Sequence, residues 1–145
     1  MKSILFTLSL IFLVACSKND DIKPNPNIPN INFNTGNLVN INLPEYSQLQ
    51  FSGNHEILNS YGLKGVVLYY IGGNQYSAFE LTDPNHVPSS CSKLNVEGVI
   101  ATCGCDDGNS YDILTGSMRE GTNGGYTLKP YRVEVAGNII RVFNN

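Results

Sequence analysis

The residues best suited to chemistry lie in the run Cys103-Gly104-Cys105-Asp106-Asp107, which places two thiols and two carboxylates within five positions. Thiolates are soft ligands that suit iron–sulfur clusters, whereas carboxylates are hard oxygen ligands. The run has the outline of a metal-cluster loop, but it contains no histidine that would complete one. Whether the protein transfers electrons depends on this loop.

The N-terminus predicts a lipid anchor. A short apolar run from Ile4 to Ala15 leads directly into Cys16, and small residues followed by cysteine are typical of a lipoprotein signal. The apolar run is shorter than the about 20 residues that a spanning helix needs. We therefore expect a signal peptide at 1–15 and a lipidated Cys16 that attaches the protein to the membrane. The alternative is a plain signal peptide with an incidental Cys16.

The segment after the lipobox is rich in Asn and Pro and shows no hydrophobic periodicity. We expect residues 16–37 to form the lipidated N-terminus and a flexible tether, followed by one domain at 38–145. Asp20 and Asp21 resemble the export signal that sends some Bacteroidetes lipoproteins to the cell surface, and a solvated linker is the alternative. The predicted location is the cell envelope, as an outer membrane lipoprotein, with surface exposure as one option.

Composition and alternation predict an antiparallel all-β domain. The formal charge of −3 disfavours a nucleic-acid partner, which would need a basic patch. Apolar residues alternate with Asn over 38–43, which predicts a strand that ends in a turn at Pro44. Two hairpins are expected, at 66–81 around Gly72-Gly73-Asn74 and at 131–143 around Ala136-Gly137-Asn138. No helical spacing persists, so a sandwich or small barrel is the expected architecture.

A series of motifs extends from about residue 39 to the C-terminus. In order they are Ala78-Phe79, Cys91-Ser92-Lys93-Leu94, Glu97-Gly98, VIATCGCDDGNSYD at 99–112, Thr115-Gly116 and LKPYRVEVAGNIIRV at 128–142. This order resembles a Rieske domain. The resemblance implies an antiparallel β fold with two inserted loops, patterned Cys-x-His and Cys-x-x-His, that clamp a [2Fe-2S] cluster through two thiolates and two imidazoles.

One of the four cluster ligands is retained when that pattern is overlaid on the chain. Asp83 and Asn85 occupy the positions of the first-loop cysteine and histidine. Cys103 matches the second-loop cysteine, while Asp106 stands where histidine is expected and Asp107 is an extra residue. Carboxylates and amides replace thiolates and imidazoles poorly, so the prediction is a Rieske-like scaffold without a cluster. The alternative is a [2Fe-2S] cluster with unorthodox ligands.

The resemblance also implies a disulfide, since respiratory-type Rieske domains join their cluster loops through cysteines that match Cys91 and Cys105. A secreted compartment permits the bond. Pairing of Cys91 with Cys103 is the alternative, because residues two apart on a strand share a face. His86 would be a nitrogen donor if the first loop shifted by one residue, and is otherwise a solvated loop residue. Tyr111 corresponds to a tyrosine that bonds the cluster in some members, and core packing is the role favoured here.

Two other chemistries receive less support from the sequence. Oxygen donors suited to calcium occur at Asp106, Asp107, Asn109 and Asp112, but their spacing does not match an EF-hand loop, so solvated turn residues are expected. No hydrolase elbow, phosphate-binding glycine loop or Cys/His catalytic pair can be recognised. We therefore expect no catalytic residues and no metal.

The expected function is that of a lipid-anchored binding or interaction module rather than an enzyme. Its candidate contact surface consists of Pro84–Pro88 and Gly104–Asn109, which would face a protein partner in the envelope. The alternative function is electron transfer, as a component of an oxidoreductase that holds the [2Fe-2S] cluster with Cys103 among the ligands.

Overall fold

The computed structural model describes residues 24–144, so the predicted signal peptide, Cys16 and Asp20-Asp21 lie outside the described residues. In chain order the elements are β1 (Phe33–Asn34), η1 (Pro44–Gln50, a 3-10 helix), β2 (His55–Leu58), β3 (Val66–Gly72), β4 (Gln75–Glu80), β5 (Leu94–Glu97), β6 (Ile100–Cys103), β7 (Ser110–Asp112), β8 (Arg132–Ala136) and β9 (Ile139–Asn144). Within residues 24–144, no helix has the length and apolarity that a membrane crossing requires. The predicted all-β class is confirmed.

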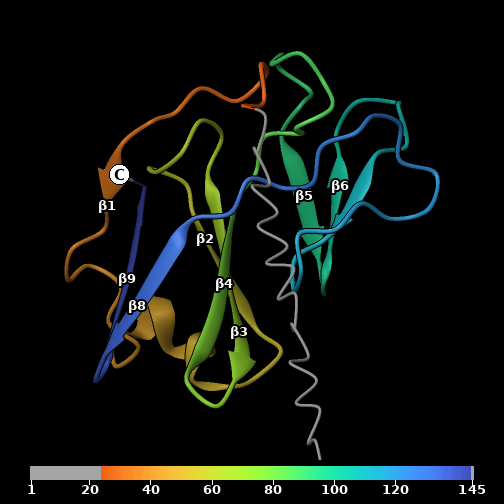
Figure 1. Cartoon of the computed structure of the whole chain (residues 1–145). Helices are drawn as coiled ribbons and strands as arrows, with labels where there is room; N and C mark the ends of the chain where they lie inside the picture. Colours follow the sequence, from red (N-terminus) through yellow and green to blue (C-terminus); the bar gives the residue numbers. More distant parts are fainter. Residues whose placement is uncertain (1–23, 145) are drawn as a thin grey trace, which may run out of the picture.

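The strands form three antiparallel sheets with the orders β1-β9-β8, β2-β3-β4 and β5-β6-β7. The sheet β2-β3-β4 lies between the other two (Figure 1). Val66 and Leu68 on one face of β3 pack in a core that includes Ile140 of β9, whereas Val67 on the other face packs in a core that includes Leu94 of β5. Because successive strand residues point to opposite faces, burial of both faces explains why β3 begins as a continuous apolar run.

Both predicted hairpins are confirmed. Strand β3 pairs with β4, and β8 pairs with β9, each antiparallel. The first turn contains Asn74 with a φ of 61°, and the second contains Gly137 with a φ of 60°. These left-handed conformations are accessible to glycine and, at moderate cost, to asparagine, which is why the short turn motifs were readable in the sequence.

The prediction of a strand at 38–43 is wrong. Val39 is buried, but Leu38 and Leu43 are 61% and 46% exposed, and Asn40 makes a single bridge to Ile139. The Asn40 side-chain oxygen accepts the N–H of Asn42 at 3.0 Å, which turns the backbone. Asparagine side chains compete with strand pairing in this way, so the period-two pattern marks a turn that leads into η1.

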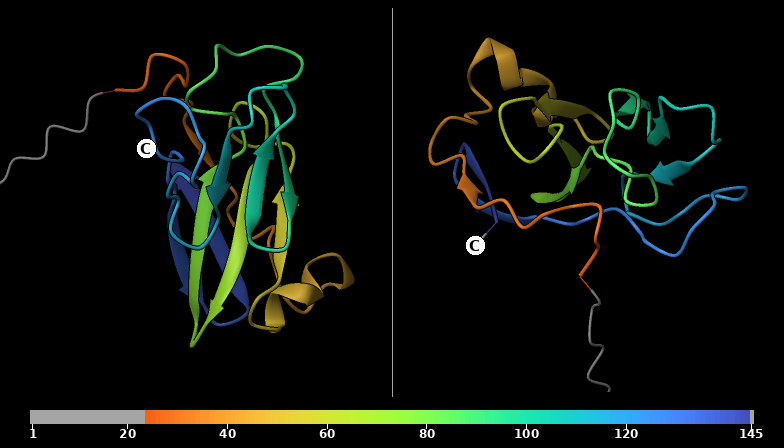
Figure 2. Two further views of the ribbon diagram at one scale, coloured as in Figure 1. Left: turned by 90° about the vertical axis from the view of Figure 1, so that its right-hand side faces the viewer. Right: turned by 90° about the horizontal axis from the view of Figure 1, so that it is seen from above.

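Residues 24–37, which the sequence assigns to the tether, pack against the domain. Strand β1 pairs with β9, and the side chain of Ile28 is buried. The side-chain amides of Asn25 and Asn27 both donate to the Pro84 carbonyl, at 2.9 and 3.0 Å. Figure 2 shows this segment beside the chain that leads into β8. The described domain therefore begins before residue 38, because a few apolar side chains in a polar segment are enough to anchor it.

A buried carboxylate fixes the end of β4, where the first loop of interest begins. Glu80 accepts hydrogen bonds from the N–H of Leu63 at 2.8 Å and of Lys64 at 2.9 Å, and from Thr82 through both its N–H and its hydroxyl. The Tyr131 hydroxyl donates to the same carboxylate at 2.6 Å. Burial raises the pKa of Tyr131, and the bond to Glu80 raises it further, so this hydroxyl remains a donor. These hydrogen bonds fix the end of β4, from which the following loop starts.

Candidate functional site

Three loops lie next to the sheet β5-β6-β7, which we call the small sheet (Figure 1), and hydrogen bonds described below join them. We call residues 82–92, between β4 and β5, the first loop, and residues 104–109, between β6 and β7, the second loop. Residues 119–126, between β7 and β8, are the third loop. All positions that the resemblance assigns to cluster ligands lie in the first two loops or at Cys103, where β6 ends.

Asp83 is the centre of this arrangement and is fully buried. One carboxylate oxygen accepts the Asn85 N–H at 2.8 Å and the Tyr111 hydroxyl at 2.5 Å, and the other accepts the Asn109 side-chain amide at 3.0 Å. Burial raises the pKa of Asp83, but the hydrogen bonds from Tyr111, Asn109 and the Asn85 N–H lower it by more, so the net pKa is below its ordinary value. The carboxylate is therefore ionised and bonded on both oxygens near neutral pH.

Asn85 connects the first loop to the third. Its side-chain oxygen accepts the N–H groups of Gly125 at 3.0 Å and Tyr126 at 2.9 Å. Its amide nitrogen donates to the Tyr126 carbonyl at 2.7 Å and to the Tyr111 hydroxyl at 3.0 Å. An amide side chain has two donor hydrogens and two acceptor lone pairs, so this one is fully used. Gly124 has a φ of 115°, and a Cβ there would overlap the Asn85 side chain, so glycine is required for the approach.

Asn109 and Tyr111 complete the network from the second loop and β7. The Asn109 side-chain oxygen accepts the N–H of Asn123 in the third loop at 2.9 Å. The Tyr111 ring is buried in the core between the sheet β2-β3-β4 and the small sheet, in the packing role favoured from the sequence. Its hydroxyl also donates a hydrogen bond to Asp83. Burial raises the pKa of Tyr111 and the bond to Asp83 raises it further. We call Asp83, Asn85, Asn109 and Tyr111 the Asp83 network.

Two of the cysteines are close together in the structure. Cys91 and Cys105 form a disulfide in the structure, with their Cα atoms 4.9 Å apart, within the usual range. Cys103 is buried and is the free cysteine among the described residues. Burial raises the pKa of its thiol to about 12, and the neighbouring carboxylates of Asp83 and Asp107 contribute to the rise. The surroundings of Cys103 therefore favour the protonated thiol when no cation is bound, and a coordinated metal ion would reverse that preference.

Two groups of side chains within residues 24–144 have ligand atoms close enough to share a metal ion. The first is His86, Cys91 and Cys105, and the second is Cys103, Cys105 and Asp107. Neither includes Asp106, which is exposed, or Asp112, whose carboxylate accepts the N–H groups of Leu114 and Thr115 in the following turn. The four oxygen donors considered for calcium are thus not brought together.

The residues at the cluster positions do not fit an iron–sulfur cluster. Two irons held in the Rieske manner need two thiolates and two imidazoles. Of the four positions, Asp83 and Asn85 are engaged in internal hydrogen bonds and Asp106 is an exposed carboxylate, so Cys103 supplies the one thiol and no position supplies an imidazole. The sequence identified these positions but not the hydrogen bonds that tie Asp83 and Asn85 to Asn109, Tyr111 and Tyr126, because these partners lie 26 to 41 residues away.

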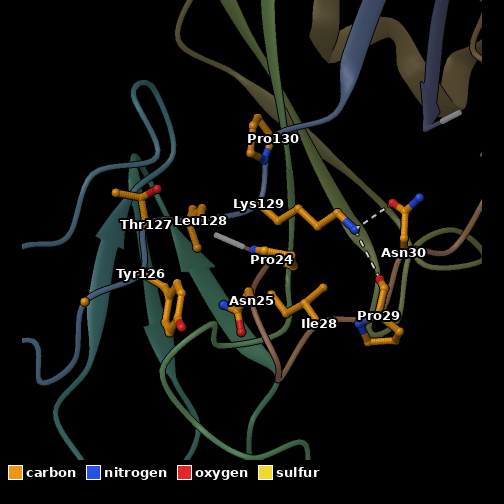
Figure 3. A pocket seen from close by; sticks show the side chains of 11 residues that line it. Pro24, Asn25, Ile28, Pro29, Asn30, Tyr126, Thr127, Leu128, Lys129 and Pro130 are labelled. Atoms are coloured by element: carbon orange, nitrogen blue, oxygen red, sulfur yellow. Dashed lines mark hydrogen bonds between the residues drawn. The ribbon is translucent and has the colours of Figure 1, made fainter. Parts of the chain in front are cut away.

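An apolar pocket of about 680 Å³ (Figure 3) is lined in part by Tyr126, whose backbone is bonded to Asn85. Residues 24–30 form one side, and residues 125–130 form the other, with Ile28, Tyr126 and Leu128 among the lining. Lys129 crosses between the two sides and donates to the Pro29 carbonyl at 3.1 Å and to Asn30 at 3.2 Å. The sequence did not predict this pocket, because half of its lining belongs to the segment read as tether.

Comparisons with protein-family models and with curated protein sequences find no match. Among solved structures, the chain is similar to one in the complex of reduced oxygenase and oxidized ferredoxin in carbazole 1,9a-dioxygenase, with 23% identity, a TM-score of 0.42, and coverage of 63% of this chain and 82% of that one. It is also similar to a protein assigned as the small subunit of an NADPH nitrite reductase, with 20% identity, a TM-score of 0.41, and coverage of 66% and 92%.

We expect Asp83→Asn to lower the free energy of unfolding by about 2 kcal/mol at pH 7, because an ionised acceptor of three hydrogen bonds is lost. The folded state lowers the pKa of Asp83, so its contribution is fully present above the unfolded pKa of about 3.9 and is lost as the pH falls through the folded value. The difference between wild type and variant should therefore be smaller at pH 3 than at pH 7. Urea unfolding followed by circular dichroism measures both.

The matched control is Asp106→Asn, which changes an exposed carboxylate of the second loop. This variant should stay within about 0.5 kcal/mol of wild type at both pH values. An Asp83→Asn protein as stable as wild type at pH 7, or a deficit that does not change with pH, would contradict the role assigned to the carboxylate.

Proposed function

We propose that this chain is a lipid-anchored envelope protein whose Rieske-like domain holds no iron–sulfur cluster and acts as a binding or interaction module. The observation that carries the proposal is the Asp83 network. Polar atoms at the first-loop ligand positions, Asp83 and Asn85, are engaged by other parts of the protein rather than left as donors for a metal.

The network supports a binding role because it holds three loops in fixed positions. Loops that are ordered before binding lose less conformational entropy when a partner arrives. The proposed contact surface keeps the residues expected from the sequence, Pro84–Pro88 and Gly104–Asn109. Val87 in the first loop is 71% exposed, which offers an apolar side chain to a protein partner. Pro84 itself is buried beneath the N-terminal segment, so it supports the surface rather than forming it.

The apolar pocket extends this surface. The backbone of Tyr126, which lines the pocket, is bonded to Asn85, and Asn25 on the opposite side is bonded to Pro84. The pocket and the first loop are therefore mechanically connected. We propose that an envelope protein contacts the exposed part of the first loop and inserts an apolar side chain into the pocket, since concave apolar sites with a few polar groups are typical of binding sites.

The proposed anchor is the lipidated Cys16 in the outer membrane. Seven residues separate Cys16 from Pro24, where the described domain begins. A fully extended segment of that length spans at most about 25 Å. The domain would thus sit close to the bilayer surface, on a shorter connection than the sequence alone suggested, and would meet partners at the membrane.

Iron analysis tests the absence of a cluster. We expect the full chain, purified anaerobically in detergent from cells with active iron–sulfur assembly, to contain far less than one iron per chain and to be colourless. A Rieske protein purified from the same cells is the control for cluster assembly. A stoichiometric [2Fe-2S] absorbance and electron paramagnetic resonance signal that disappears in Cys103→Ser would overturn this part of the proposal in favour of electron transfer.

Detergent partitioning tests the anchor. The full chain, expressed in a bacterium that processes lipoproteins, should enter the detergent-rich phase of Triton X-114, because acyl chains on Cys16 add a large apolar surface. Cys16→Ala should remain in the aqueous phase, and Ser17→Ala should partition as the wild type does. Equal partitioning of wild type and Cys16→Ala would contradict lipidation.

A further inference from the structure

We propose that reduction of the disulfide between Cys91 and Cys105 creates a site for one thiophilic metal ion of the Zn²⁺ class, with His86, Cys91 and Cys105 as ligands. The site does not use Asp83, Asn85 or Asp106, so it is separate from the positions of an iron–sulfur cluster. It also needs no protein partner, so it does not depend on the proposed binding function.

The ligand atoms are already gathered by the two loops. The potential ligand atoms of His86, Cys91 and Cys105 all lie within 4.8 Å of one another. Cys105 also belongs to the second such group, with Cys103 and Asp107. Cys105 is common to both groups, so Asp107 of the second group is available as a fourth ligand. Cys91 is exposed and His86 is partly exposed, so an ion can reach the outer side.

The spacing suits a tetrahedral ion once the sulfur atoms are no longer bonded. Zinc bonds of about 2.3 Å to sulfur and 2.0–2.1 Å to nitrogen place neighbouring ligand atoms about 3.5–3.8 Å apart. Because the ligand atoms of the His86 group already lie within 4.8 Å of one another, side-chain rotations that part the two sulfurs would bring them to that spacing. Two sulfurs joined in a disulfide cannot act as thiolate ligands, so the disulfide and the metal exclude each other.

The His86 imidazole has one ring nitrogen available for a metal ion. Its Nδ1 lies 2.6 Å from the carbonyl oxygen of Val87. A carbonyl oxygen can only accept a hydrogen bond, so Nδ1 carries the proton and Nε2 keeps a free lone pair. A hydrogen bond from the second ring nitrogen to a carbonyl is how metal-binding histidines are usually held. Two thiolates and one imidazole favour zinc or cuprous ions over calcium and magnesium.

Reduction of the disulfide to two thiols requires two electrons, which a dithiol reductant supplies. A thiolate of the reductant attacks one sulfur of the Cys91–Cys105 bond and forms a mixed disulfide. The second thiol of the reductant then displaces the protein sulfur, so that the reductant leaves as a disulfide and the protein keeps two thiols. Binding of the metal ion releases the two thiol protons. Since His86 and Cys105 lie in the proposed contact surface, the redox state would change that surface.

Cobalt titration tests the proposal, with Co²⁺ as the spectroscopic probe for Zn²⁺. Peptide mapping without reductant should first find Cys91 linked to Cys105 in the full chain purified in detergent. After anaerobic reduction with a phosphine and its removal, one Co²⁺ per chain should bind and give the visible bands of a tetrahedral ion and a thiolate charge-transfer band. Added Zn²⁺ should remove both, and the oxidised chain should show neither.

Two variants separate this site from unspecific thiol binding. His86→Ala should weaken Co²⁺ binding at least about tenfold, and Cys91→Ser should abolish the tetrahedral spectrum. The control His55→Ala changes the other histidine of the chain, on β2, and should bind as wild type does. The proposal is overturned if the reduced chain gives no tetrahedral spectrum, if His86→Ala binds as tightly as wild type, or if Cys91 and Cys105 are found free before reduction.

Discussion

A buried carboxylate needs hydrogen-bond donors, and the positions of the three loops depend on the donors that the first two loops and β7 supply to Asp83. Removing an ionised group from water is costly unless donors replace the lost solvent. Asp83 receives its donors from three places, which are the backbone of its own loop, Asn109 of the second loop and Tyr111 of β7. Asn85 and Asn109 then bond the third loop. The geometry of the candidate site follows from this chain of requirements.

The same device occurs three residues earlier in the chain. Glu80 is also fully buried, and it is satisfied by a turn, by the start of the first loop and by the hydroxyl of Tyr131. Each carboxylate thus pairs with one buried tyrosine, on opposite sides of the middle sheet. Glu80 fixes the end of β4 and Asp83 fixes the loop that follows it, so hydrogen bonds order this loop. Such networks are cooperative, and their loss is felt across all the loops that they join.

Local signals allowed most of the fold to be predicted, and long-range partners limited the rest. The hairpins were readable because turn residues and alternation lie within a few positions. The packing of residues 24–37 could not be predicted in this way, because the composition of this segment resembles a linker. The burial of Ile28 and the pairing of β1 with β9 depend on residues about 100 positions away. In the site, Asp83 and Asn85 were singled out as positions of missing ligands. The hydrogen bonds from Gly125 and Tyr126 to Asn85 depend on the path of the third loop, and no sequence motif predicts that path.

Amide hydrogen exchange in the third loop is the most direct test of the claim that the Asp83 network holds the three loops together. The N–H groups of Asn123, Gly125 and Tyr126 donate to side-chain oxygens of Asn109 and Asn85 within an irregular segment. Nuclear magnetic resonance should find all three protected in the wild type, and Asn85→Ala should release Gly125 and Tyr126 while β3 remains protected. Exchange of these groups in the wild type at the rate of an unstructured peptide would contradict the account.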